Sequence, residues 1–298
     1  VKAGYRCRTV TDWGALDTVA LHRMVTRAWH HDYLDDVRPD LDEAFLANLT
    51  RAGVWLAAVC EDRARRPVGF EIAVPRKLRF GQHTLNCWYV TAFSVDCELR
   101  RQGIGRWLLE TINDAVFAQR GADLIFSTFE GGKAGSSTVQ ATYDAQGLAV
   151  HKFHESPALI LRADAAASLH NLDESVVARR VFVDSARQLR FADAEGGEAA
   201  LPTLAQLDEM TRFHHAVSFA LVQSFLDVVR EPPVAEAGGY WFAFDDGNWC
   251  FMTCSITKLA YNDAAIGSSL LLQTVLHKGC TNNQLKACLA KLALLAFS

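Results

Sequence analysis

Residues Ser94 to Leu109 read SVDCELRRQGIGRWLL, and this stretch decides the fold. The run before it, Cys87 to Val95, is apolar and rich in β-branched residues, whereas Ile104 to Ala118 repeats its apolar residues at helical spacing. The stretch therefore predicts a strand, a glycine turn and a helix. Gly103 and Gly105 keep side chains away from the N–H groups at the helix start, which carry the positive end of the helix dipole. We expect an anion site there, suited to a pyrophosphate.

The turn does not match the common nucleotide-binding motifs. A dinucleotide motif needs a third glycine where this chain has Trp107 and Leu108, and no Gly-Lys-Ser/Thr ending is present. The segment Arg100-Arg101-Gln102-Gly103-Ile104-Gly105 instead resembles the coenzyme A loop of the GCN5-related N-acetyltransferase (GNAT) superfamily, Arg/Gln-x-x-Gly-x-Gly/Ala after a strand. The resemblance implies that main-chain amides of the loop hold the pyrophosphate of acyl-CoA. The residues that it assigns to the cofactor are Phe93, Ser94, Val95, Arg100, Arg101, Gln102, Gly103, Ile104, Gly105 and Arg106.

The order of the predicted elements extends this resemblance over residues 1–165, which we expect to form one acyl-CoA-binding GNAT domain. The implied fold is α/β, with a mixed, mostly antiparallel central sheet flanked by helices. The expected elements are a strand at Tyr5–Val10, helices at Asp12–Trp29 and Leu41–Leu49, strands at Val54–Cys60, Val68–Pro75 and His83–Val95, a strand at Ala122–Thr128, a loop at Gly131–Ser137, a helix at Thr138–Gln146, and strands at Ala149–Phe153 and Ala158–Ala163.

The second half carries an internal repeat, which predicts two such units in tandem. Val54-Trp55-Leu56-Ala57 recurs as Tyr240-Trp241-Phe242-Ala243, and Tyr89–Leu109 aligns without gaps on Phe251–Leu271. In that alignment Asp263 replaces Arg101, so the second copy would repel a pyrophosphate. We therefore expect a connector at 166–186 and a degenerate GNAT-like domain at 187–298. Its expected elements are strands at Gln188–Ala192, Tyr240–Phe244 and Trp249–Thr257, helices at Leu201–Met210 and His214–Val229, and a strand, turn and helix within Phe251–Leu271.

A second segment, Tyr143-Asp144-Ala145-Gln146-Gly147-Leu148, resembles the Tyr-x-x-x-Gly-Phe segment near the end of GNAT domains. The resemblance implies that Tyr143 protonates the departing CoA thiolate. It also implies an oxyanion hole from the Phe93–Val95 backbone. The general base stays open, because the family's Glu position is Thr91, which cannot act as a base. The candidates elsewhere are Glu71, Glu130, His151 and His154.

Three functions fit these residues. The first is an acyl-CoA-dependent acyltransferase that moves an acetyl group to a small-molecule amine. The second is a GNAT-like decarboxylase of malonyl-CoA type, which would supply a starter unit to a polyketide synthase and work with an acyl carrier protein. That reaction needs no base, and Thr91 would stabilise the thioester enolate. The third is a non-catalytic module that binds acyl-CoA.

The composition, charge and hydrophobicity of the chain narrow the classes of protein to which it can belong. The chain has 298 residues, is 50% hydrophobic and carries a net charge of −4 without a long basic run, which argues against a nucleic-acid protein. Its eight cysteines are scattered without zinc-like spacing, so we expect no metal, reduced thiols and a cytoplasmic location. No apolar run reaches the ~20 residues that cross a bilayer, and no signal peptide opens the chain, so no membrane partner is expected. The start at Val1 suggests trimming or excision from a longer chain.

Overall fold

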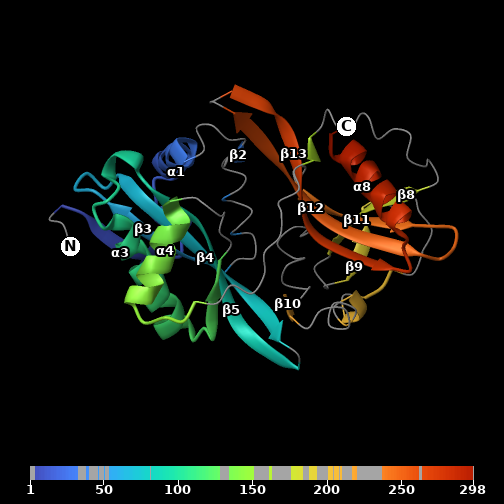
Figure 1. Cartoon of the computed structure of the whole chain (residues 1–298), viewed down its shortest axis with the longest axis horizontal. Helices are drawn as coiled ribbons and strands as arrows, with labels where there is room; N and C mark the ends of the chain where they lie inside the picture. The colour runs from blue at the N-terminus through green and yellow to red at the C-terminus, as the bar shows by residue number, and fades with distance from the viewer. Residues whose placement is uncertain are drawn as a thin grey trace. The chain divides into compact units, whose positions relative to one another are not determined.

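The computed structural model divides into two compact units, each built on one β-sheet (Figure 1). The first comprises Val1–Leu78, Thr84–Pro157 and Tyr261–Asp263, and the second comprises Arg79–His83, Ala158–Ala260 and Ala264–Ser298. The structure describes residues 4–32, 38–39, 46, 50, 54–80, 82–127, 134–150, 161–162, 176–183, 188–192, 201–203, 205–207, 209, 217–219, 237–261 and 264–297. The predicted α/β class, with sheets flanked by helices, is confirmed.

The sheet of the first unit is mixed and mostly antiparallel, as predicted. Its strands follow the order β1 (Arg6–Val10), β3 (Leu56–Glu61), β4 (Pro67–Phe80), β5 (His83–Val95) and β6 (Leu124–Phe126). β3 pairs with both β1 and β4 in antiparallel fashion, whereas β5 and β6 are parallel. A parallel neighbour requires a crossover connection, and the segment from the glycine turn to β6 supplies it.

Helices cover both faces of this sheet. Successive residues of β4 point to opposite faces, so they pack against different helices. Phe70 and Ile72 pack in one buried cluster with residues of α1 (Thr18–Asp32). On the other face, α3 (Ile104–Asp114) comes so close to Gly69 that a Cβ there would lie 2.8 Å from Leu108 Cδ1. Gly69 therefore sets how near α3 approaches the sheet. A single turn of π-helix, Ala115–Gln119, continues α3, and α4 (Ala134–Ala145) packs beside it through the cluster of Leu109 and Tyr143.

The sheet of the second unit has the order β7 (Leu161–Arg162), β13 (Ala264–Lys278), β12 (Trp249–Tyr261), β11 (Ala237–Ala243), β8 (Val177–Val183) and β9 (Leu189–Phe191). The last helix, α8 (Asn282–Phe297), packs on it through Cys288 and Leu292, which share a buried cluster with Phe242 (Figure 1). Two short strands, β2 (Arg38–Pro39) and β10 (Val217–Phe219), complete the strands of the described residues. No helix within these residues is long and apolar enough to cross a membrane.

The predicted strand, turn and helix at Phe251–Leu271 is wrong. Residues 264–278 form strand β13, so Gly267 lies inside a sheet rather than at a helix start. β13 is hydrogen-bonded on both sides, by β12 and β7, and this pairing overrides the local pattern. The two sheets nevertheless share a sequence of elements. In the first, β3, β4 and β5 are consecutive neighbours that lead to α3, and in the second β11, β12 and β13 lead to α8.

Other elements also differ from expectation. The connector at 166–186 contains β8, which is paired on both sides with β11 and β9. The helix expected at His214–Val229 contains strand β10, and Ala134–Ser137, expected as loop, opens α4. The strand expected at Ala158–Ala163 appears as β7 and pairs with β13 in the second sheet. For β7 and β8, a strand partner that lies far away in the sequence decides the structure. Leu41–Leu49 and Ala149–Phe153 lie mostly outside the described residues, and the domain boundaries stay a prediction.

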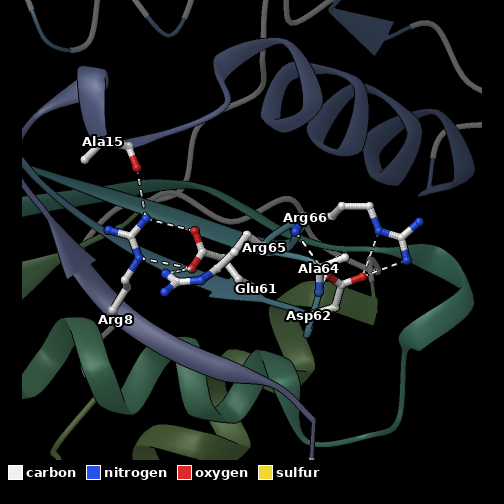
Figure 2. Close-up of polar contacts among 7 residues, drawn as sticks. All are labelled: Arg8, Ala15, Glu61, Asp62, Ala64, Arg65 and Arg66. Carbon is white, nitrogen blue, oxygen red and sulfur yellow. Dashed lines mark hydrogen bonds and ion pairs between the residues drawn. The ribbon is translucent and has the colours of Figure 1, made fainter.

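A buried carboxylate at the end of β3 ties three elements together (Figure 2). Glu61 is 5% exposed, and Arg8 of β1 donates to both of its oxygens at 2.8 and 3.1 Å. Arg8 also donates to the Ala15 carbonyl oxygen at 3.0 Å, which anchors the short 3-10 helix Trp13–Ala15. In the turn that follows, Arg66 pairs with Asp62 at 2.7 Å, and this Arg66 is largely exposed.

We expect Arg8→Ala to lower the free energy of unfolding by about 3 kcal/mol, because it leaves the Glu61 charge buried with only Arg65 nearby. Arg66→Ala is the matched control, since an exposed ion pair contributes about 0–1 kcal/mol. Urea denaturation of both variants measures the difference. Equal losses would show that the Arg8–Glu61 pair contributes no more than a surface pair.

Candidate functional site

The start of α3 is an uncapped helix terminus. Gly103 is its N-cap residue, adopts φ +82°, and makes no side-chain cap hydrogen bond. The first helical bond runs from Trp107 N to the Gly103 carbonyl oxygen at 3.0 Å, so the N–H groups before Trp107 have no acceptor within the helix. A Cβ at Gly103 would meet nothing within 4 Å, whereas at Gly105 it would lie 3.0 Å from Phe93 Cζ. The turn thus presents bare amides at the positive end of the helix dipole.

The corresponding helix start in the second unit is closed. Thr281 Oγ1 accepts from Gln284 N at 3.2 Å, and Thr281 N donates to Gln284 Oε1 at 2.8 Å. This reciprocal capping box satisfies two of the amides at the helix start and places the Thr281 and Gln284 side chains there. Gly279 adds a close contact before α8, because a Cβ there would lie 2.1 Å from Asn248 Oδ1. Of the two helix starts, the one at Gly103 alone is open.

The three arginines of the turn have different surroundings. Arg100 pairs with Asp32 at the end of α1, through a 3.0 Å bond from Nη2 to Oδ2, and also donates to the Ala28 carbonyl oxygen at 3.1 Å. Arg106 pairs with Glu110 one turn along α3 at 2.7 Å. Arg101 is exposed and adopts φ +59°. Arg100 therefore holds the turn against α1, and Arg106 is paired along its own helix.

The end of β5 is held in an unusual conformation. Ala92 adopts φ +56°, which a non-glycine residue rarely takes inside a strand. Ser94 stabilises it: its Oγ donates to the Ala92 carbonyl oxygen at 3.0 Å and accepts from Trp29 Nε1 at 3.0 Å. The parallel ladder with β6 runs from Cys87 to Tyr89, while β5 continues to Val95. The predicted oxyanion backbone, Phe93–Val95, thus lies where the described pairing with β6 has ended.

Two buried polar groups without hydrogen-bond partners face the same side of the first sheet. Tyr143 of α4 packs against Phe93 and Leu109, and its Oη has no partner among the described residues. Glu71 of β4 is 2% exposed, and its Oε2 likewise has none. Burial raises the pKa of Glu71 to about 8. Burial, and secondarily the Glu71 charge, raises the pKa of Tyr143 well above its usual value, so the two groups interact electrostatically.

The structure separates the other candidates from this pair. Thr91 follows Tyr89 at strand spacing, and Tyr89 packs with the α1-side cluster, so Thr91 points away from the face of Tyr143. Glu130, His151 and His154 lie outside the described residues. Among the described residues, no group of three His, Cys, Asp or Glu side chains could hold a metal ion. Gly69 and Trp29 shape the site without having been predicted, since neither belongs to a sequence motif.

A carboxyl group that stays protonated near neutral pH and a phenol with a raised pKa make a pair that can accept and return protons. The pair lies on the side of the sheet that α3 and α4 cover. The bare amides at Gly103 begin α3 on that same side. The arrangement can therefore combine anion binding at one end with proton transfer further along the sheet.

Residues 18–136 match the model of the acetyltransferase (GNAT) family. The solved structure of Saccharomyces cerevisiae N-myristoyltransferase with bound myristoyl-CoA matches 99% of this chain and 75% of its own, with 10% identity and a TM-score of 0.50. Glucosamine-6-phosphate N-acetyltransferase from Arabidopsis thaliana matches 51% of this chain and 97% of its own, with 11% identity and a TM-score of 0.37. Similarity at these identities concerns the fold alone. No curated protein matches the chain by sequence.

Because the pKa of Glu71 is raised, we expect the free energy of unfolding to fall as the pH rises. The unfolded chain releases this proton near pH 4.5 whereas the folded protein keeps it to about pH 8, so the free energy of unfolding falls between these values. Glu71→Gln removes that loss. We expect it to stabilise the protein by about 4 kcal/mol at pH 8 and by less than about 1 kcal/mol at pH 5.

Denaturant titrations at both pH values test this expectation. Glu98→Gln is the control, because Glu98 is exposed. A gain of the same size at pH 5 and pH 8 would mean that Glu71 is already ionised in the folded protein at pH 5.

Proposed function

We propose that this protein is an acyl-CoA-dependent acyltransferase that moves an acetyl group to a small-molecule amine. The observation that carries the proposal is the uncapped start of α3 at Gly103, where bare amides meet the positive end of the helix dipole. The match of residues 18–136 to the GNAT family supports an acyl-CoA co-substrate. So does the similarity in fold, along the whole chain, to a structure solved with myristoyl-CoA.

In this proposal the pyrophosphate of acyl-CoA binds the amides of Gly103 to Arg106. The pantetheine arm then follows β5 beyond Tyr89, where the described ladder with β6 has ended and the strand edge can pair with an amide-bearing ligand. The backbone at Phe93–Val95 supplies the donor for the thioester oxygen as negative charge develops there. The strain at Ala92, held by Ser94 and Trp29, orients that backbone.

Glu71 and Tyr143 carry the protons. The amine nitrogen attacks the thioester carbonyl carbon, so that a C–N bond forms and the C–S bond breaks. Glu71, ionised, takes the amine proton directly or through one water, and Tyr143 gives its phenol proton to the CoA thiolate. Transfer of the proton from Glu71 to the tyrosinate then restores both groups. Their unpaired polar atoms, Oε2 and Oη, support this assignment, because burying such groups without partners costs stability.

The second unit, for which we retain the proposed span 187–298, would not bind CoA in the same way. Its helix α8 is capped by Thr281 and Gln284, so two of the amides at that start already have acceptors. We propose that it is a degenerate copy of the first unit that serves as a structural companion. One CoA then binds to each chain.

Gly103→Asp should abolish CoA binding, because an aspartate at an N-cap accepts from the first helical amides and repels the pyrophosphate. Gly103→Ala is the matched variant. It shares the backbone strain at φ +82° and its Cβ has free space, so CoA affinity should stay within about threefold. Calorimetry should give one CoA per chain for the unchanged protein.

Asn282→Glu controls for charge at a helix start in general, since it puts a carboxylate at the first residue of α8 and should leave CoA affinity unaltered. Unchanged CoA binding in Gly103→Asp would place the pyrophosphate elsewhere. A stoichiometry of two would overturn the closed second site.

The rate of thiol release from acetyl-CoA in the presence of an amine should rise with pH as Glu71 ionises, reach half its maximum at about pH 8, and level off about one pH unit higher. Glu71→Gln should remove this rise and lower kcat by roughly 10²–10⁴, with CoA affinity preserved. Tyr143→Phe should lower kcat without changing CoA affinity. A Glu71→Gln variant that keeps the pH profile would exclude Glu71 as the base.

A further inference from the structure

A hollow of about 480 Å³ lies in the first unit, and its lining shares no residue with the proposed acyl-CoA site. Cys97, just after β5, forms one wall. The other wall is a single face of α1, because its residues recur at spacings of four along the helix. These residues are His22, Arg23, Thr26, Arg27, His30 and His31.

The chemistry of this lining suits an anion. Guanidinium groups donate in a planar fork that matches phosphate, and imidazole and hydroxyl groups add further donors. The described lining contains no Asp or Glu. This local balance runs against the whole chain, whose net charge is −4. The described lining is therefore more cationic than the chain as a whole.

Two carboxylates beside the lining, Asp96 and Asp32, are engaged in ion pairs, whereas Glu98, next to Cys97, is exposed. Asp96, which is 7% exposed, pairs with Arg27, and Asp32 pairs with Arg100. Arg100 also donates to the Ala28 carbonyl oxygen, which offsets the negative end of the α1 dipole. The Arg27–Asp96 pair neutralises both of its members, so Arg27 is already engaged. Arg23, which is exposed and also lines the hollow, is therefore the guanidinium that we expect to meet an anion there.

The hollow is open to solvent, and its volume exceeds what a bare ion fills. At ~30 Å³ per water, about 480 Å³ corresponds to roughly sixteen water molecules, far more than one phosphate displaces. Volumes between ~300 and ~1,000 Å³ are typical of sites for small organic molecules. The occupant should therefore carry an organic body as well as its charge.

We propose that this hollow binds a small organic phosphate, with Arg23 as its principal charge partner. The role that we give to this molecule rests on the proposed acyltransferase function. The bound phosphate is either part of the acyl acceptor or the 3′-phosphate of CoA itself. Both sources fit because the hollow and the glycine turn are joined by the short segment Asp96–Arg100, whose two end residues both pair with α1.

Ribose 5-phosphate and ribose are the probes, titrated by calorimetry at low ionic strength. The phosphate should bind at least tenfold more tightly than ribose. Arg23→Gln should weaken ribose 5-phosphate binding at least fivefold, whereas Arg120→Gln, another exposed arginine of the same unit, should leave it unchanged. Equal binding of the two probes, or an unchanged affinity in Arg23→Gln, would overturn the site.

CoA and dephospho-CoA distinguish the two sources of the phosphate. If the hollow holds the 3′-phosphate, ribose 5-phosphate competes with CoA, and Arg23→Gln weakens CoA but not dephospho-CoA. If it holds the acceptor, ribose 5-phosphate binds equally well at saturating CoA. Both results support the hollow. Gly103→Asp should leave ribose 5-phosphate binding intact. A failure of the unchanged protein to bind CoA would refute the acyltransferase proposal but not the binding of ribose 5-phosphate in the hollow.

Discussion

The close approach of α3 to the first sheet is the constraint on which the rest of the site depends. Gly69 on β4 and Gly105 in the first turn of α3 remove the two side chains that would keep helix and sheet apart. Interiors are close-packed, so even one methyl group at either position would push the helix outward. Because the helix start is pinned against the end of β5, its bare amides lie at a defined point beside Phe93.

Around this contact the protein keeps several features that cost stability. Ala92 and Arg101 adopt left-handed backbone conformations, and Glu71 and Tyr143 bury polar atoms without partners. The surrounding structure supports the two backbone conformations, through the Ser94–Trp29 bond next to Ala92 and the Arg100–Asp32 pair next to Arg101. Such costs persist in proteins where they serve a function. Their gathering along one path, from Gly103 to Glu71, is the main structural argument for an active site.

The two units show how similar element orders lead to different chemistry. In both, three neighbouring strands are followed by a glycine with positive φ and a helix. The difference lies in a few side chains. Thr281 and Gln284 cap α8, whereas Gly103 leaves α3 open. Since a fold by itself does not specify function, these capping residues separate a proposed cofactor site from a closed helix end.

By itself, the sequence determined the first unit closely. The strand at His83–Val95, the helix starting at Ile104 and the glycine turn between them were predictable, because turn chemistry and helical periodicity are local. Tyr143 was a candidate only through its resemblance to a GNAT segment, and Glu71 was one of four candidates for the base. Tertiary structure alone decided that Glu71 and Tyr143 share one face of the sheet, that Thr91 lies on the other face, and that Arg100 pairs with a residue of α1. It also decided that Ala264–Lys278 is a strand, because hydrogen bonds to partners distant in sequence outweigh any local pattern.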